Sequence, residues 1–486
     1  MKLNLRKMYR NMSPAVRTSF WFTICNFLQR GIALFTVPVF TRLLTTQEYG
    51  ICNVYFTWAE IFIVFTSLQI PYEGLNNGLI RYEEDKDGYT SAAAGLILVI
   101  TLLVSGVYLL LRNPIDRMTG LNGMIMKLMF IQLLFNPPLM LWLNRERFDF
   151  RYRWPVAVTV ISTVLNPVIS IIAVCNTRYK AEARIIGSVL TQSFFGFLVL
   201  CMLIYRGKVF FKKEYWHFAL RFNLPLIFYY LSQLILNQAD RVMINFFEGS
   251  GKAALYSMAY TAATIMMLLV SAVNGTFAPW MYRKLKQGQA KDIRRVAGGL
   301  CFLIAGATLA MSAFAPDLLR IMATEEYREA IWIIPPVSAS VFFIFLYMMF
   351  ANVEMYFDEN RGILVISIVC SVANLILNGI FIPVCGYMAA GWTTLFCYGL
   401  LTIFHYLLMK RARRKNQISD AIFPGKLFLA VSFCVIGLSC VILVVYRWNI
   451  LRYGILILEA GVLLILRKKL AGIWRQMGKG DKKHEK

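Results

Sequence analysis

Long apolar stretches recur along the whole chain and are separated by short polar segments. Each stretch runs for about 18 to 25 residues, the length that an α-helix needs to cross the hydrocarbon core of a bilayer. The apolar residues are continuous and do not alternate with polar ones, so the pattern indicates helices and not the strands of a barrel. It predicts an all-α polytopic membrane protein with about fourteen transmembrane helices. They are expected at residues 15–41, 49–70, 90–111, 123–143, 154–175, 183–205, 219–246, 253–277, 294–315, 329–350, 362–384, 387–409, 425–446 and 450–467.

Local sequence patterns also indicate an internal duplication. Three segments of the first half resemble three of the second half, in the same order and at a nearly constant offset: 50–57 with 254–261, 162–170 with 371–378, and 180–183 with 387–390. The second pair sets Asn166 opposite Asn374. Repeats of this type are common in secondary transporters, which bind substrate between the halves. The pattern predicts two pseudo-symmetric six-helix lobes and an added pair of helices, with boundaries at 1–211, 212–412 and 413–470, and a basic cytoplasmic tail at 471–486.

Composition agrees with this picture, and the charge adds an orientation. Of the 486 residues, 58% are hydrophobic, more than a soluble chain of this size could bury. The net charge of +25 would suggest nucleic acid in a soluble protein. Here most Lys and Arg lie in one alternate set of connections, namely the N-terminal segment, 145–153, 206–221, 282–295, 410–426 and the C-terminal segment. The positive-inside rule places this set and both termini in the cytoplasm, and no nucleic-acid partner is expected.

Residue patterns that support catalysis are missing from the sequence. Every connection is short, which weighs against chemistry in a separate extramembrane domain. No Gly-rich phosphate-binding loop, Ser/His/Asp set or paired carboxylates stand out. The ten cysteines form no CxxC pair, and the three histidines are far apart. We therefore predict that the chain is not an enzyme, with no catalytic residues, no metal and no cofactor.

The first predicted helix carries Asn26, Gln29 and Arg30 on one face, because residues three and four apart are neighbours on a helix. A charge at the bilayer centre costs at least ~2.5–3.5 kcal/mol on insertion scales, so it needs an explanation. Arg30 either faces an internal cavity, extends to the membrane interface, or pairs with a carboxylate such as Glu60 on the next helix. Glu60 itself is either a proton or cation site or one partner of a structural ion pair.

The predicted helix 219–246 presents a similar polar face with Asn237, Asp240 and Arg241. If the two lobes pack as the repeat predicts, this face and that of Arg30 line a shared central cavity, which two arginines would make cationic. The alternative is that Asp240 and Arg241 form an interfacial pair near the end of their helix.

Other polar residues within predicted helices favour structural roles. Asn166, Asn374 and Asn378 are expected to form hydrogen bonds between helices. Glu354 lies near the cytoplasmic end of its predicted helix, and we expect it at the membrane interface.

Three segments carry a resemblance to a known family: "VPVFTRLLTTQEYG" at 37–50, "DRVMINFFEGSGKAALYSMAY" at 240–260 and "NLILNGIFIPVCGYMAAGWTT" at 374–394. In this order and spacing they resemble the polysaccharide flippases of the multidrug/oligosaccharidyl-lipid/polysaccharide (MOP) exporter superfamily. The resemblance covers nearly the whole chain. It implies two six-helix lobes with a central cationic cavity, in a multi-pass protein of the bacterial cytoplasmic (inner) membrane.

The resemblance also implies a cargo and partners. The cargo would be an undecaprenyl-diphosphate-linked oligosaccharide, moved by alternating access for capsule, exopolysaccharide or O-antigen-type export. Membrane lipids, H⁺ or Na⁺ as a coupling ion, and polysaccharide polymerase machinery are the further candidate partners. Guanidinium groups suit phosphates, and amides suit sugar hydroxyls. The expected substrate-binding residues are Arg30, Arg241, Asn26, Gln29 and Asn237, and the expected coupling or gating residues are Asp240 and Glu60.

Rival functions remain open on the sequence. A multidrug or cation antiporter of the same superfamily is the nearest, although the intramembrane charge here leans basic. A flippase for the peptidoglycan lipid precursor shares the helix count and a cationic cavity. A membrane-embedded polysaccharide polymerase would need a sizeable outer loop or a carboxylate-bearing loop, and the chain has neither.

Overall fold

The computed structural model describes residues 13–418 and 420–478. This part of the chain is helical and contains no strand, which confirms the predicted all-α class. Fourteen helices in it have more than twenty residues: α2 (Pro14–Leu43), α3 (Thr46–Ser67), α5 (Lys86–Leu110), α7 (Gly123–Phe148), α8 (Arg153–Cys175), α9 (Lys180–Gly207), α10 (Lys213–Glu248), α11 (Ser250–Lys286), α12 (Ala290–Met322), α13 (Ile334–Tyr356), α14 (Asn360–Cys385), α15 (Ala389–Lys415), α16 (Gly425–Val445) and α17 (Asn449–Gly478).

Each long helix overlaps one predicted transmembrane segment. Among the described residues, thirteen helices are long and apolar enough to cross a membrane. The fourteenth predicted segment, 450–467, falls within α17. The chain is therefore a multi-pass membrane protein.

Short helices lie between some of the long ones and were not predicted. They are η1 (Ile70–Gly74), α4 (Leu75–Arg81), η2 (Glu83–Asp85), α6 (Arg112–Thr119) and η3 (Glu325–Trp332). After α3 the chain turns at Leu68 and Gln69, whose positive φ angles of 48° and 55° end the helix. Ile70 and Leu75 are then buried, and Asn144 of α7 donates a hydrogen bond of 2.9 Å to the carbonyl oxygen of Pro71. This connection is a packed part of the fold.

Residue contacts divide the described chain into two units. Unit 1 runs to Leu234 and includes Gly249–Ala254, and unit 2 comprises Ile235–Glu248 and the residues from Leu255 onward. The boundary thus falls within α10. The predicted division into lobes at 1–211 and 212–412 with an added helix pair stays a proposal.

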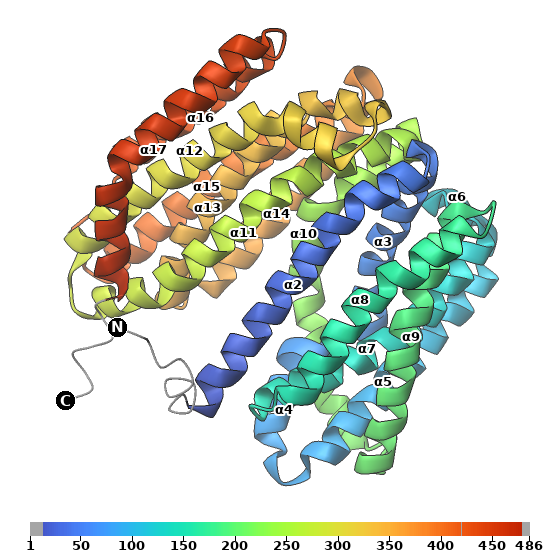
Figure 1. The fold of residues 1–486 in the computed structure, drawn as a ribbon. Coiled ribbons are helices and arrows are strands. Elements are labelled where there is room, and N and C mark those ends of the chain that lie inside the picture. The colour runs from blue at the N-terminus through green and yellow to red at the C-terminus, as the bar shows by residue number, and fades with distance from the viewer. Residues whose placement is uncertain (1–12, 419, 479–486) are drawn as a thin grey trace, which may run out of the picture. The chain divides into compact units, whose positions relative to one another are not determined.

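In unit 1, α9 packs against α5, α7 and α8, and α2 packs against α8. Figure 1 shows α7, α8 and α9 running side by side. Glycines permit the close approach of α9. A Cβ atom at Gly187 would lie 2.4 Å from Ser170 Oγ on α8, and one at Gly196 would lie 2.1 Å from the carbonyl oxygen of Phe135 on α7. Small residues at such crossings let helix backbones come together.

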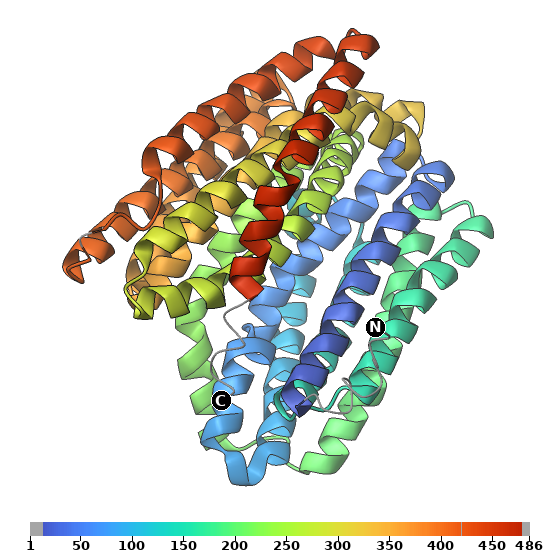
Figure 2. The same ribbon diagram turned by 60° about the vertical axis from the view of Figure 1, so that its left-hand side comes forward.

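In unit 2, α13 is the central helix. It packs against α12, α15 and α16, and nearly all of its side chains are buried. α14 packs mainly on α15, and α17 packs on α12. Figure 2 shows α17, drawn in red, beside α12. α13 and α15 also carry much of the buried polar chemistry of this unit.

Candidate functional site

The polar face of α10 carries a carboxylate that is almost completely buried. Asp240 is 1% exposed. Its Oδ1 accepts a hydrogen bond of 2.6 Å from Asn378 Nδ2 on α14. Its Oδ2 accepts from the hydroxyl of Thr394 on α15 at 2.7 Å and from the phenol of Tyr256 on α11. Donors from three helices therefore converge on one carboxylate.

Asn378 connects this carboxylate to a wider network. Its Nδ2 also approaches Asn374 Oδ1 at 3.3 Å, one helical turn away, and its Oδ1 accepts a hydrogen bond from the hydroxyl of Thr393. The interhelical role expected for Asn378 is confirmed by its bond to α10. Asn374 Nδ2 is buried and has no hydrogen-bond partner among the described residues.

Arg241 lies next to Asp240 in the chain but makes different contacts. Its Nη1 donates to Gln238 Oε1, and its guanidinium lies 4.7 Å from the centroid of the Tyr260 ring. Its Nε is buried without a hydrogen-bond partner in the described part of the protein. Asp240 is hydrogen-bonded to three other helices, and the alternative of an interfacial Asp240–Arg241 pair stays a prediction.

Asn237 lies one helical turn before Arg241 and joins two tyrosines. Its Oδ1 accepts a hydrogen bond of 2.9 Å from the phenol of Tyr398 and a longer one of 3.4 Å from the phenol of Tyr260. The three predicted residues of α10 thus lie in unit 2 beside Asn378, which the sequence identified, and beside tyrosine and threonine side chains that it did not.

A second buried acidic group of unit 2 pairs with histidine. His405 Nδ1 lies 2.7 Å from Glu354 Oε2, and both residues are at most 1% exposed. Glu354 Oε1 is buried without a hydrogen-bond partner among the described residues. The ring of Tyr347 stacks on His405 at 5.5 Å and on Tyr398 at 6.3 Å. Glu354 lies near the end of α13 and is buried against His405 of α15, and its expected position at the membrane interface stays a prediction.

Unit 1 contains its own buried polar cluster around Arg184 of α9. Arg184 Nη1 donates to Ser170 Oγ at 2.9 Å and to Asn166 Oδ1 at 3.1 Å, both on α8. Its guanidinium also lies 4.2 Å from the ring centroid of Phe40 on α2 and 5.5 Å from that of Phe56 on α3. Asn166 therefore has the interhelical role that was expected, but the sequence did not single out Arg184.

The predicted repeat sets residues of the two clusters opposite each other. Asn166 corresponds to Asn374, and the alignment of 50–57 with 254–261 sets Phe56 opposite Tyr260. Each unit thus places a guanidinium over the ring at this repeat position. The arginine comes from α9 in unit 1 and from α10 in unit 2.

The four remaining predicted residues all lie in unit 1. Asn26, Gln29 and Arg30 are exposed on α2. Glu60 is exposed on α3. Desolvation, and then the negative charge of Glu60, raise the pKa of the Tyr72 phenol. A cavity shared by Arg30 and Arg241 stays a prediction.

The described residues form no group of three or more His, Cys, Asp or Glu side chains that could hold a metal ion. The clusters are instead suited to hydrogen bonding, to binding anions through guanidinium groups, and to proton exchange at buried acids.

Comparisons with known proteins place the chain in a family. The model of the family described as "Polysaccharide biosynthesis protein" matches residues 15–284, more than half of the chain. An uncharacterized membrane protein of Haemophilus influenzae is 23% identical over 302 residues, covering 58% of this chain and 69% of that protein. The "Lsg locus putative protein 1" of the same organism is 22% identical over 269 residues, covering 52% of this chain and 62% of the relative.

Solved structures share the fold at low sequence identity. The lipid II flippase MurJ in an inward closed conformation has a TM-score of 0.66 at 14% identity, covering 92% of this chain and 99% of that chain. An inward-facing multidrug resistance MATE family transporter of the MOP superfamily has a TM-score of 0.59 at 14% identity, covering 80% of this chain and 96% of that chain. The chain therefore belongs to the polysaccharide biosynthesis protein family and has the fold of MOP-superfamily transporters.

Proposed function

We propose that the chain is a flippase for an undecaprenyl-diphosphate-linked oligosaccharide in the bacterial cytoplasmic membrane. It would act by alternating access, in the export of a capsule, exopolysaccharide or O-antigen-type polysaccharide. The observation that carries the proposal is the polar face of α10, with a guanidinium and an amide beside a buried carboxylate, in a chain of a polysaccharide biosynthesis family. Hydrocarbon alone would reject a diphosphate and its sugars, so a polar path across the membrane is needed.

The proposed substrate-binding residues divide by chemistry. Arg241 and Arg30 would attract the diphosphate, because guanidinium groups form charge-assisted hydrogen bonds with phosphate oxygens. Asn237, Asn26 and Gln29 would hydrogen-bond the sugar hydroxyls. The contacts of the Arg241 side chain with Gln238 and with the ring of Tyr260 support this role, because they hold its guanidinium on the polar face of α10.

Asp240 would serve in coupling, with H⁺ or Na⁺ as the ion and Glu60 as a second candidate. All three of its hydrogen bonds use the carboxylate as an acceptor. A proton on either oxygen would replace an acceptor with a donor and weaken the attachment of α10 to α11, α14 and α15. The buried acid is therefore positioned to link ion binding to helix movement.

Transporters with two other kinds of cargo share this fold. The similar solved structures include a lipid II flippase and a multidrug transporter. The family match and the arginine over Tyr260 favour a lipid-linked polysaccharide precursor, because a guanidinium would repel a cationic drug. Polymerase machinery would then act on the product on the opposite side of the membrane.

The proposal is tested by substitution in a strain that depends on this chain for polysaccharide export. Arg241→Ala and Arg30→Ala should each reduce export several-fold at unchanged protein level, whereas Arg361→Ala, an exposed arginine at the start of α14, should not. Normal export in both test variants would contradict a cationic cavity lined by Arg30 and Arg241. In proteoliposomes, a labelled undecaprenyl-diphosphate oligosaccharide should cross and ethidium should not; the reverse result would establish the drug exporter.

A further inference from the structure

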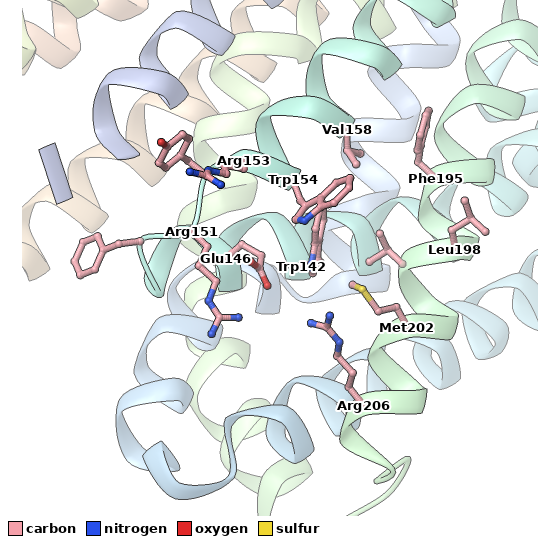
Figure 3. A pocket seen from close by; sticks show the side chains of 13 residues that line it. Trp142, Glu146, Arg151, Arg153, Trp154, Val158, Phe195, Leu198, Met202 and Arg206 are labelled. Carbon is pink, nitrogen blue, oxygen red and sulfur yellow. The ribbon is translucent and has the colours of Figure 1, made fainter. Parts of the chain in front are cut away.

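Unit 1 contains a pocket of about 800 Å³ that is separate from its polar cluster. The pocket lies between the end of α7, the connection to α8, and the second half of α9 (Figure 3). Its wall combines an acidic side chain with basic and indole side chains, among them Glu146, Arg151, Arg206, Trp142 and Trp154. None of these five belongs to the predicted site.

The acidic group of this pocket is buried. Glu146 is only 8% exposed, and Figure 3 shows its carboxylate directed into the pocket. Arg151 and Arg206 approach it from two sides, and their charges, together with that of Arg145, act on the carboxylate. Arg145 forms ion pairs with Asp87, at 3.0 Å between Nη2 and Oδ1, and with Asp149. Arg151 and Arg206 are exposed at the pocket, and their two positive charges face the single negative charge of Glu146. An anionic ligand can therefore bind beside them without leaving an uncompensated negative charge in the pocket.

A tight turn fixes Arg151 in this place. Phe150 adopts a left-handed conformation with φ of 56°, and the backbone N–H of Arg151 donates a hydrogen bond of 2.8 Å to the carbonyl oxygen of Glu146. The hydroxyl of Thr18 on α2 donates to the carbonyl oxygen of Phe150 at 2.7 Å. The geometry that sets a guanidinium beside the buried acid is therefore part of the packed fold.

The rest of the pocket wall is apolar and aromatic. Trp142 is buried beneath the charged groups, whereas Trp154 is 74% exposed at the rim. Val199 and Met202 of α9 complete the wall. An exposed indole beside guanidinium groups is typical of a membrane interface, where one end of a ligand is apolar and the other is polar.

We propose that this pocket binds the headgroup of a lipid whose phosphate carries a sugar, an assignment that rests on the proposed function. Arg151 and Arg206 bind the phosphate oxygens through charge-assisted hydrogen bonds. The Glu146 carboxylate accepts hydrogen bonds from sugar hydroxyls, since an ionised carboxylate only accepts. The indole of Trp154 covers an apolar face of the sugar ring, and the wall of α9 receives the start of the lipid chain.

The position of the pocket fits a loading site. The connection between α7 and α8 belongs to the Arg-rich set that the charge pattern assigns to the cytoplasm. The lipid-linked precursor would thus be held at the membrane surface before it crosses. An ordinary phospholipid offers the phosphate but no sugar ring, so it uses the arginines and leaves Glu146 and Trp154 unused.

The test measures binding of three probes to the purified full chain: undecaprenyl diphosphate carrying one hexose, bare undecaprenyl diphosphate, and phosphatidylglycerol. Arg151→Ala combined with Arg206→Ala should weaken both diphosphate probes by about tenfold or more, as expected for loss of charge-assisted bonds. The double Lys variant, which keeps the charges without the guanidinium forks, should lose less. Glu146→Gln should weaken binding of the hexose probe several-fold and should not weaken binding of the bare diphosphate.

Arg147→Ala is the matched control, because Arg147 is an exposed arginine of the last turn of α7 that does not line the pocket and lies over the ring of Phe22. Unchanged binding in the Arg151/Arg206 variant, or an equal loss in the Arg147 variant, would overturn the site. Equal binding of phosphatidylglycerol and the hexose probe would overturn the sugar assignment. Transport is measured separately in proteoliposomes. If the wild type binds the hexose probe at this site but does not move it across, the proposed function fails and the pocket stands.

Discussion

Asp240 shows how a single buried charge is held in this protein. Its carboxylate receives hydrogen bonds from Asn378, Thr394 and Tyr256, each on a different helix. Hydrogen bonds to charged groups are stronger than neutral ones, and leaving such a group unsatisfied is costly. The residue therefore has a structural task, holding α10 in unit 2, and the proposed coupling role would require this attachment to change on protonation.

Asp240→Asn tests the structural task. The new side-chain amide nitrogen is a donor and would face the donors that now bond to the carboxylate, so at least one hydrogen bond is lost. We expect the free energy of unfolding to fall by about 1–3 kcal/mol. Denaturant unfolding of the purified protein measures it. Tyr256→Phe removes one donor and leaves Thr394 and Asn378 on the carboxylate, so its loss should be smaller, about 0.5–1.5 kcal/mol. An Asp240→Asn variant as stable as the wild type would contradict the role given to this carboxylate.

The sequence indicated only one side of this site. Asn237, Asp240 and Arg241 recur on one helical face, a pattern that is visible locally. Their partners come from α11, α14 and α15, and no local pattern brings those helices together. Arg184 lies close in sequence to a basic connection, which hid its position within α9. His405 is a lone histidine in an apolar helix, and only the fold reveals its contact with Glu354.

α9 illustrates packing at the scale of the element. Two of its three glycines meet different neighbouring helices, Gly187 facing α8 and Gly196 facing α7. Moving an apolar helix face from lipid to another helix gains no hydrophobic free energy, because lipid tails are as apolar as the side chains. Close contact between the helix backbones must therefore contribute much of the free energy of helix association. Substitution at these positions should therefore be felt throughout unit 1.

Gly196→Ala is the sharpest test of this packing. Its Cβ would lie 2.1 Å from the backbone carbonyl oxygen of Phe135, which cannot move aside as a side chain would. We expect a loss of about 1–3 kcal/mol, the usual cost of overpacking, measured by thermal or denaturant unfolding. Gly399→Ala on α15 is the matched control, since a Cβ there meets nothing within 4 Å and should be neutral or slightly stabilising. Equal effects of the two changes would refute the close approach.

A surface contact joins the connection after α13 to the end of α15. Lys415 Nζ lies 2.8 Å from Glu359 Oε1, and this hydrogen bond, followed by the positive charges of Lys415 and Arg411, lowers the pKa of Glu359. A carboxyl group whose pKa is lower in the folded state stabilises the folded protein when the pH is above the pKa of the unfolded state. This contribution is lost as the pH falls through the pKa of the folded state. Because the pair is exposed, the contribution is small.

Lys415→Ala should therefore lower the unfolding temperature slightly at neutral pH, and the difference from the wild type should vanish at a pH well below the pKa of Glu359. Arg414→Ala, at the neighbouring position of α15, is the control and should show no such pH dependence. A difference that persists in acid would point to packing and not to the carboxylate.

For the whole molecule, the helix count was predictable because membrane insertion sums hydropathy over some twenty residues, so single exceptions hardly alter the result. The segment after α3 was not predictable in the same way. Its turn depends on left-handed conformations at Leu68 and Gln69, and its burial depends on α5 and α7. The predicted repeat rests on weak local similarity, and Phe56 and Tyr260, which it sets opposite each other, each lie near a guanidinium.

Orientation is the property of the whole chain that the charge pattern predicts most directly. The connection after α8 and the end of α15 are separated by seven helices, α9 to α15, so they must face opposite sides of the membrane. The positive-inside rule assigns the Arg- and Lys-rich end of α15 to the cytoplasm. The same assignment includes Lys483, which lies outside the described residues.

Single cysteines introduced at two exposed positions, Tyr179 and Asn416, in a chain whose native cysteines are replaced, test this orientation. In intact cells a membrane-impermeant maleimide should label Tyr179→Cys and spare Asn416→Cys, and permeabilised cells should label both. Labelling of Asn416→Cys from outside would reverse the topology. It would also place the α7–α8 connection, and with it the pocket of Glu146 and Arg206, on the outer surface, where a lipid awaiting transport could not be loaded. The one measurement thus bears on both the direction of transport and the site proposed to begin it.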